Sequence, residues 1–149
     1  MADDFRQLET LFKIEKDKEQ GYATDLNSAQ SFYQLNIQKL KEVEGYKLDY
    51  LRQLQQRGNA GLQGGNYMHF QRFIVQLDEG IVAQCHAVDV AKQVVQQRRA
   101  IWLEQRSKTQ AVETVLANKR AKKQLVMDKL EQADNDEFAL QKFVRQQHV

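Results

Sequence analysis

The chain contains no proline, and this absence constrains its fold more than any other feature of the 149-residue sequence. Proline interrupts helices most strongly, because its ring removes a backbone donor and clashes with the preceding turn. Glycine and asparagine, which tolerate turns, gather in Gly58–Asn66, a stretch that holds four of the seven glycines. The sequence therefore predicts two long helices, residues 3–57 and 67–145, joined by a bend at 58–66.

Apolar residues recur at alternating spacings of three and four on both sides of this bend. The first series runs from Phe5 to Leu54, and eleven of its fifteen positions are apolar or aromatic. The second runs from Phe70 to Val144, with fifteen of twenty-two positions apolar. This spacing is the heptad pattern of a coiled coil. We therefore expect one all-α domain, residues 1–149, built as an antiparallel two-helix coiled-coil hairpin whose second helix is longer than the first.

The two series also predict which residues face each other. Folding the chain about Leu62 pairs residues whose numbers sum to 124, so that Tyr22 meets Trp102. The coincidence of two independently read series across one bend supports the hairpin. Gly45 then falls beside Gly80, where we expect the backbones to approach closely or the hairpin to flex.

Two layers of this register are polar. Glu15 falls opposite Thr109, and Glu19 falls opposite Gln105. Because such side chains fill a seam less well than apolar ones, we expect a wet and poorly packed section there.

The second helix is expected to extend past the first beyond about Lys119. Its apolar stripe continues there with Val126, Leu130, Leu140 and Val144. An apolar stripe that cannot be covered within the monomer usually marks a partner site.

Charge is unevenly distributed although the whole chain carries only +2. Residues 1–25 have a net charge of −3 and residues 92–123 have +7, so their attraction favours the antiparallel register. The small total predicts no strong affinity for nucleic acid or membranes. Two alternatives remain open: a nucleic-acid-binding helical arm using residues 92–123, and a generic coiled-coil scaffold or membrane-surface module.

No motif for catalysis or metal binding is found in the sequence. The glycines of Gly58–Gly65 lack the Lys-Ser or Lys-Thr of a phosphate loop. His69, His86 and His148 are dispersed, and the single Cys85 lies in no zinc-site spacing. We therefore expect no enzyme activity, no cofactor and no metal.

Targeting signals are also missing. The chain begins with the acidic Met1–Asp4, and no run approaches the ~20 apolar residues of a membrane-spanning helix. One cysteine fits a reducing compartment. These features predict a soluble protein of the cytoplasm.

Several residues resemble the FliJ family of flagellar type III export proteins. They are the pair Tyr46 and Tyr50 before the bend, then Tyr67–Ile74 with Leu77, Trp102–Arg106, and Asp136-Glu137-Phe138. The resemblance spans nearly the whole chain as scattered positions.

The resemblance implies a non-enzymatic coupling component of flagellum biogenesis, and hence of motility and chemotaxis. Proteins of this family form an antiparallel coiled coil similar to the stalk, or gamma, subunit of rotary ATPases. The implied partners are the hexameric export ATPase (FliI-like), the cytoplasmic domain of the export gate protein (FlhA-like) and export chaperones. The implied location is the cytoplasm, with peripheral attachment to the inner membrane at the flagellar base through these partners.

The resemblance also assigns an export-gate-binding surface near the bend. Its residues are Val43, Tyr46, Tyr50, Phe73, Leu77, Gly80 and Gln84. Gly80 departs from the expected alanine and Gln84 from the expected histidine.

The heptad pattern divides this surface in two. Tyr46 and Phe73 lie beside the seam, so their rings should be partly exposed and available as binding hot spots. Val43, Tyr50 and Leu77 lie on the seam, where plain core packing is the alternative explanation.

For the ATPase, geometry and resemblance together nominate the open end of the hairpin, where charged side chains can meet complementary loops of a ring. The candidate residues are Lys119, Arg120, Lys122, Lys123, Asp136, Glu137 and Phe138.

Overall fold

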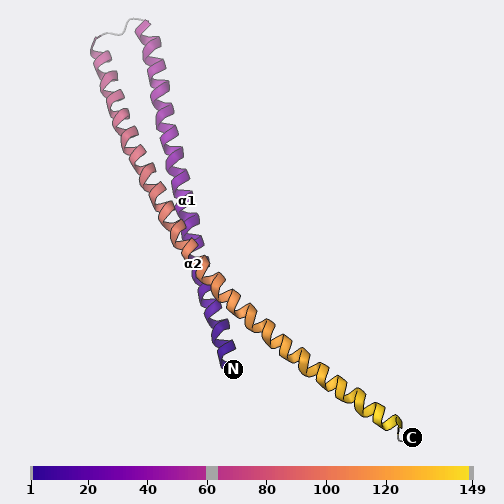
Figure 1. Cartoon of the computed structure of the whole chain (residues 1–149). Helices are drawn as coiled ribbons and strands as arrows, with labels where there is room; N and C mark the ends of the chain where they lie inside the picture. The colour runs from indigo at the N-terminus through magenta and orange to yellow at the C-terminus, as the bar shows by residue number, and fades with distance from the viewer. Residues whose placement is uncertain (1, 60–63, 148–149) are drawn as a thin grey trace. The chain divides into compact units, whose positions relative to one another are not determined.

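Two long helices make up the part of the chain that the structure describes, residues 2–59 and 64–147. In this computed structural model, α1 spans Ala2–Asn59 and α2 spans Gly64–Gln147. Over residues 20–104 the two helices run side by side in opposite directions (Figure 1). The predicted fold class is confirmed: the described chain is all-α, an antiparallel two-helix hairpin, and α2 with 84 residues is longer than α1 with 58.

The helices extend further toward the bend than the glycine cluster predicts. Gly58 and Asn59 end α1, and Gly64–Asn66 begin α2, although the prediction places all of them in the bend. A glycine costs a helix only about 1 kcal/mol relative to alanine, which is too little to end one by itself. The rest of the predicted bend, Ala60–Gln63 with the fold centre Leu62, lies outside the described residues.

The hairpin divides into two compact units, and each of them contains parts of both helices. We call residues 20–104 the central unit, and residues 2–19 together with 105–147 the terminal unit.

The predicted seam is confirmed along α1 and along most of α2. Every position of the α1 series from Phe5 to Leu54 is buried or half-buried, and so is the α2 series from Phe70 to Leu116 with one exception. The fully buried apolar side chains are Leu26, Phe70, Ala91, Val95 and Leu116. They are few because a seam between only two helices is open to solvent along both sides.

Arg98 is that exception, since its side chain is exposed. Lys119 and Lys123, which also fall on the predicted series, are exposed as well. A guanidinium or ammonium group is costly to bury unpaired, and a long side chain can carry its charge out to water. The heptad spacing locates the facing side of the helix but does not guarantee that a charged side chain stays there.

The expectation of a poorly packed polar section is wrong. In the terminal unit, Thr109 is 1% exposed and Gln105 is 6% exposed. Thr109 Oγ1 lies 3.2 Å from the backbone oxygen of Glu15 and 3.0 Å from that of Gln105. Gln105 Nε2 donates to the Glu15 backbone oxygen at 3.2 Å and to the Glu15 carboxylate. The polar atoms satisfy one another, and a satisfied polar layer packs closely.

The partner of Gln105 also differs from the expected one. The predicted register places Glu19 opposite Gln105, whereas Gln105 bonds to Glu15, one helical turn away. Glu19 instead pairs with Lys16 of its own helix at 3.4 Å. The predicted meeting of Glu15 with Thr109 is confirmed.

The expectation of a close backbone approach at Gly45 and Gly80 is also wrong. A Cβ atom added at either glycine would meet no atom within 4 Å outside its own stretch of helix.

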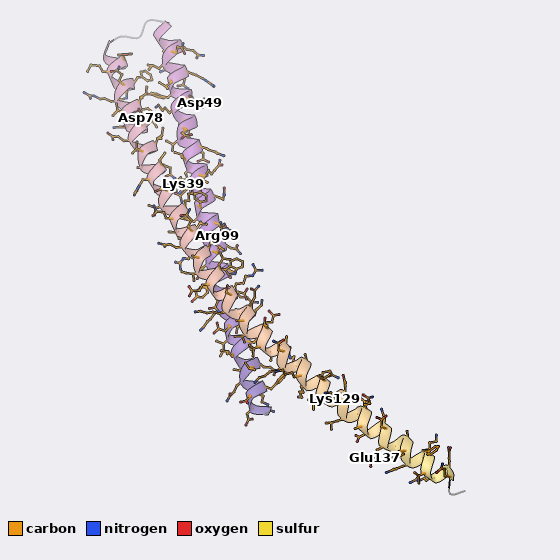
Figure 2. The ribbon with its side chains drawn as sticks, viewed as in Figure 1. Lys39, Asp49, Asp78, Arg99, Lys129 and Glu137 are labelled. Atoms are coloured by element: carbon orange, nitrogen blue, oxygen red, sulfur yellow. The ribbon has the colours of Figure 1, made fainter. Side chains whose placement is uncertain are left out.

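Every described side chain of α2 after Leu116 is exposed. Lys129 and Glu137, labelled in Figure 2, lie on this stretch. The predicted exposure of the apolar stripe is confirmed, with Leu130 at 62% and Leu140 at 62%. The overhang starts later than about Lys119, however, because Phe5 of α1 still contacts Arg120 and Lys123.

Candidate functional site

The seven residues assigned to gate binding all belong to the central unit and occupy the seam and one flank of it. Continuing the heptad series places Tyr46 immediately before one seam position of α1, and Phe73 and Gly80 immediately before seam positions of α2. In an antiparallel pair, residues at this heptad position lie on the same side of the seam. We call this side the aromatic flank, with Tyr46, Phe73 and Gly80 as its residues.

Aromatic rings connect this flank to the seam. The Tyr50 ring lies 4.4 Å from the Phe73 ring and 5.1 Å from the Phe70 ring, both in tilted arrangements. Arg57 lies over the other ring of the cluster, 5.7 Å from the Phe70 centroid. Tilted ring pairs at these separations are favourable beyond the area they bury. The Tyr50 ring in the seam therefore supports the Phe73 ring.

The exposure expected for the two flank rings is confirmed. Tyr46 is 69% exposed and Phe73 is 39% exposed. Val43, Tyr50 and Leu77 are half-buried in the seam. The structure thus leaves two of the assigned rings exposed and three of the assigned side chains half-buried in the seam.

The two residues that depart from the family pattern differ in what surrounds them. Gly80 is exposed, and an added Cβ would meet nothing within 4 Å, so the missing methyl group removes no contact within the hairpin. Gln84 is half-buried, and its amide donates to the backbone oxygen and to Oδ1 of Asn36 at 3.0 and 3.1 Å. The Gln84 amide therefore donates its hydrogen bonds to Asn36 inside the seam.

An ion pair borders the gate-binding residues. Lys47 Nζ of α1 lies 2.5 Å from Asp78 Oδ1 of α2. Both side chains are partly open to water, so this pair contributes little to stability. The pair places one positive and one negative charge next to Leu77.

The basic residues assigned to ATPase binding lie in the terminal unit, on one segment of α2. Arg120 pairs with Glu9 of α1 at 3.4 Å, and its guanidinium lies 5.7 Å from the Phe5 ring centroid. Lys123 Nζ lies 5.2 Å from the same ring. The basic run thus lies beside the first turns of α1 and is partly neutralised there by Glu9.

Phe5 and Glu9 are functional candidates that the sequence pattern alone does not select. The heptad spacing gives Phe5 only a seam position, whereas its half-buried ring serves as a platform for two cations. The signal is present in the sequence as an aromatic residue and an acid spaced four apart, opposite a basic run.

The acidic residues assigned to the same site are not brought together with the basic run. Asp136, Glu137 and Phe138 are exposed on α2, and Phe138 is 70% exposed. Asp136 lies thirteen positions after Lys123 on the helix, a rise of about 20 Å. The predicted ATPase site therefore consists of two patches.

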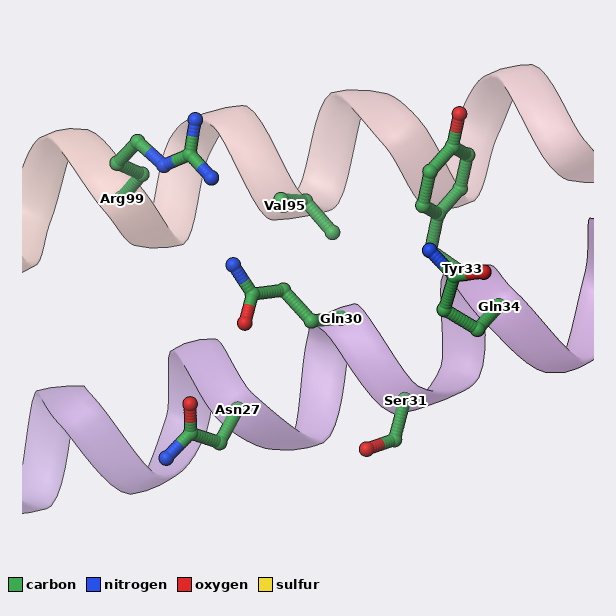
Figure 3. Close-up of a pocket in the computed structure, with 7 residues that line it drawn as sticks. All are labelled: Asn27, Gln30, Ser31, Tyr33, Gln34, Val95 and Arg99. Atoms are coloured by element: carbon green, nitrogen blue, oxygen red, sulfur yellow. The ribbon is translucent and has the colours of Figure 1, made fainter.

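A shallow polar depression lies elsewhere in the central unit. Figure 3 shows Gln30 of α1 and Val95 of α2 pointing into the space between the helices. The lining residues are Asn27, Gln30, Ser31, Tyr33, Gln34, Val95 and Arg99. The depression is open to solvent and combines amides with one guanidinium, which suits a surface contact better than the enclosure of a small molecule.

Metal-ligating clusters and membrane spans are both missing from the described residues. No group of three or more His, Cys, Asp or Glu side chains among them could hold a metal ion. Neither described helix contains a stretch long and apolar enough to cross a membrane. Cys85 is a free, exposed thiol.

Comparison with known proteins gives one match. The family model described as "Flagellar FliJ protein" matches residues 4–148. No curated protein and no solved structure matches the chain.

Proposed function

The chain belongs to the FliJ family of flagellar, export-related coiled-coil proteins, and from that premise we propose that it links the export ATPase to the export gate. In this proposal it performs no catalysis itself. The aromatic flank and the seam beside it bind the cytoplasmic domain of the gate protein, and the terminal unit binds the hexameric ATPase. The protein also handles export chaperones and works in the cytoplasm, held at the inner membrane through these partners.

The aromatic flank carries this proposal. Tyr46 of α1 and Phe73 of α2 both expose large apolar rings, and the Phe73 ring is supported by Tyr50 at 4.4 Å. Exposed aromatic side chains that are held in place lose little conformational freedom on binding, which makes them effective anchors.

Separation of the two candidate surfaces also supports coupling. Every residue assigned to the gate lies in the central unit, and every residue assigned to the ATPase lies in the terminal unit. No residue is assigned to both partners, so the two proposed surfaces do not compete for the same side chain.

The test is a binding assay with the purified gate domain and the purified ATPase. Tyr46→Ala with Phe73→Ala is expected to weaken gate binding at least about tenfold, the loss typical of anchor residues, while ATPase binding stays unchanged. Phe32→Ala is the matched control, because its ring is 58% exposed on the same unit but outside the assigned surface.

Circular dichroism of the double variant separates binding from folding. Unchanged helicity with lost gate binding supports the proposal. Gate binding that survives in the double variant, or falls equally in Phe32→Ala, contradicts it.

A further inference from the structure

A groove in the terminal unit lies between the first turns of α1 and a basic segment of α2. Its lining consists of Asp4, Phe5, Lys119, Lys122, Lys123, Val126 and Met127. Three apolar side chains and three lysines therefore share one surface depression. We call it the basic groove.

The apolar part of the basic groove is open to water. Val126 is 57% exposed and Met127 is 54% exposed, and Phe5 is half-buried beside them. The alkyl stems of lysines extend such an apolar surface while their ammonium groups remain at its edge. A partner that fits must supply both apolar side chains and negative charge.

The first turns of α1 already show how this segment of α2 holds a helix. Phe5 places its ring beneath Arg120 and Lys123, at 5.7 and 5.2 Å. Glu9, one turn further along the same helix, pairs with Arg120 at 3.4 Å. The segment therefore accepts a helix that presents an aromatic side chain and a carboxylate four residues apart.

Charge within the basic groove is unbalanced. The three lysines face one carboxylate of the lining, Asp4. The excess is positive, and it lies next to the apolar Val126 and Met127. Charge complementarity therefore selects an acidic partner.

A second copy of the chain fits this segment poorly. Pairing the exposed stripe of α2 with itself in opposite directions places Val126 against Val144 and Leu130 against Leu140. In that register Asp134 lies beside Asp134 of the second copy on one flank of the seam, and Asp136 lies beside Asp136 of the second copy on the other. Like charges facing each other disfavour this pairing.

We propose that the basic groove binds an acidic amphipathic helix of a partner protein. The helix lays a bulky apolar side chain on Val126 and Met127 and directs carboxylates toward Lys119, Lys122 and Lys123. This inference rests on the proposed function only in naming the export ATPase as the protein that carries the helix.

The experiment measures binding of a labelled probe to the full-length chain by fluorescence anisotropy. The probe is a synthetic helical peptide with glutamates flanking a leucine and phenylalanine face. A second peptide has every glutamate replaced by glutamine, and a third keeps the glutamates but replaces the apolar face with serine. The glutamate peptide with the apolar face is expected to bind at least about tenfold more tightly than either control, with affinity falling as salt rises.

Matched variants locate the site. Lys122→Glu is expected to weaken binding about tenfold, whereas Lys142→Glu makes the same charge change on an exposed position of α2 outside the groove and leaves binding within about twofold. Met127→Glu tests the apolar part and should weaken binding as well. Helicity by circular dichroism confirms that each variant is folded.

Five results overturn the proposal, four of them in binding and association and one with vesicles. The first four are absence of binding by the acidic peptide, equal binding by the serine-faced peptide, an equal loss in Lys142→Glu, and self-association in sedimentation that Lys122→Glu abolishes. Stronger Lys122-dependent binding to phosphatidylglycerol vesicles than to the peptide assigns the groove to a membrane surface and also overturns it.

A pull-down with the hexameric ATPase distinguishes this inference from the proposed function. If the chain binds the peptide through Lys122 but fails to bind the ATPase, the acidic-helix inference stands and the proposed function fails. If ATPase binding is intact in Lys122→Glu while peptide binding is lost, the proposed function stands and the ATPase is not the carrier.

Discussion

Gln84 of α2 donates two hydrogen bonds to Asn36 of α1, one to the backbone oxygen at 3.0 Å and one to Oδ1 at 3.1 Å. Asn36 uses its own amide to donate to the Phe32 backbone oxygen at 2.9 Å and is only 5% exposed. A satisfied polar layer of this kind favours one alignment of two helices, because any slip along the seam leaves a buried amide without partners.

Gln84→Leu is expected to destabilise the hairpin by about 1–3 kcal/mol, because it strips Asn36 of its bonds from α2. Urea denaturation followed by circular dichroism measures the loss. Adding Asn36→Leu is expected to recover most of it, since a leucine pair packs as a plain apolar layer. Gln96→Leu, at an exposed position of α2, is the control. A double variant that is no more stable than Gln84→Leu alone contradicts this account.

Thr109→Val tests the second polar layer. The change keeps the shape of the side chain but removes the hydroxyl bonded to Glu15 and Gln105 at 3.2 and 3.0 Å. We expect a loss of about 1 kcal/mol in the free energy of unfolding. Thr114→Val is matched, because Thr114 Oγ1 donates to Gln110 at 2.9 Å on an exposed face, and it should change stability by less than about 0.5 kcal/mol. Equal effects of the two changes would show that burial of the layer does not matter.

Two tyrosines of the central unit, Tyr46 and Tyr50, are expected to differ in how much they contribute to stability. Tyr50→Ala should cost about 2 kcal/mol, because its ring touches both Phe70 and Phe73. Tyr46→Ala should cost less than about 0.5 kcal/mol, since this ring is 69% exposed. Thermal unfolding of the two variants is the measurement. A large loss in Tyr46→Ala would assign that ring to the core and remove it from the candidate surface.

Phe5→Ala is expected to loosen the first turns of α1. It removes the ring beneath Arg120 and Lys123, where each cation–ring contact at such an open site contributes about 0.5–1 kcal/mol. Hydrogen exchange of residues 3–12 should quicken, while exchange of residues 26–36 stays unchanged. Leu11→Ala, at a side chain 42% exposed on the same turns, is the control and should show a smaller effect.

Hydrogen exchange is also expected to differ along α2. Residues 128–147 have only exposed side chains, and a helix segment without tertiary packing is marginal in water. Their amides should exchange faster than those of residues 105–116, which include the buried Gln105, Thr109 and Leu116. Uniform protection along both segments would contradict this expectation and point to a partner already bound.

The fold could be predicted because apolar residues recur at a regular spacing along both helices. The absence of proline and the alternating spacing from Phe5 to Leu54 identify the buried side of α1 without error. The spacing says nothing about which rotamer a polar side chain adopts. It therefore predicts the wrong partner for Gln105, and it places Arg98 on the seam although the charge turns outward.

The candidate site was predictable only in part, for the same reason. The exposure of Tyr46 and Phe73 follows from their place beside the seam, and the structure confirms it. The contacts of Phe5 with Arg120 and Lys123 depend on where α1 begins relative to α2. The predicted register places Phe5 opposite Lys119, and its ring instead contacts the neighbouring Arg120 and Lys123.

The narrow core has a consequence for how this protein tolerates change. Its few fully buried apolar side chains, such as Ala91 and Leu116, recur at heptad spacing, and in such a seam each layer packs mainly against the layers before and after it. A defect in one layer is therefore felt locally, much as in repeat proteins whose units contact only their neighbours. Most exposed side chains do not pack in the seam, so they can be substituted to bind new partners with little effect on the fold.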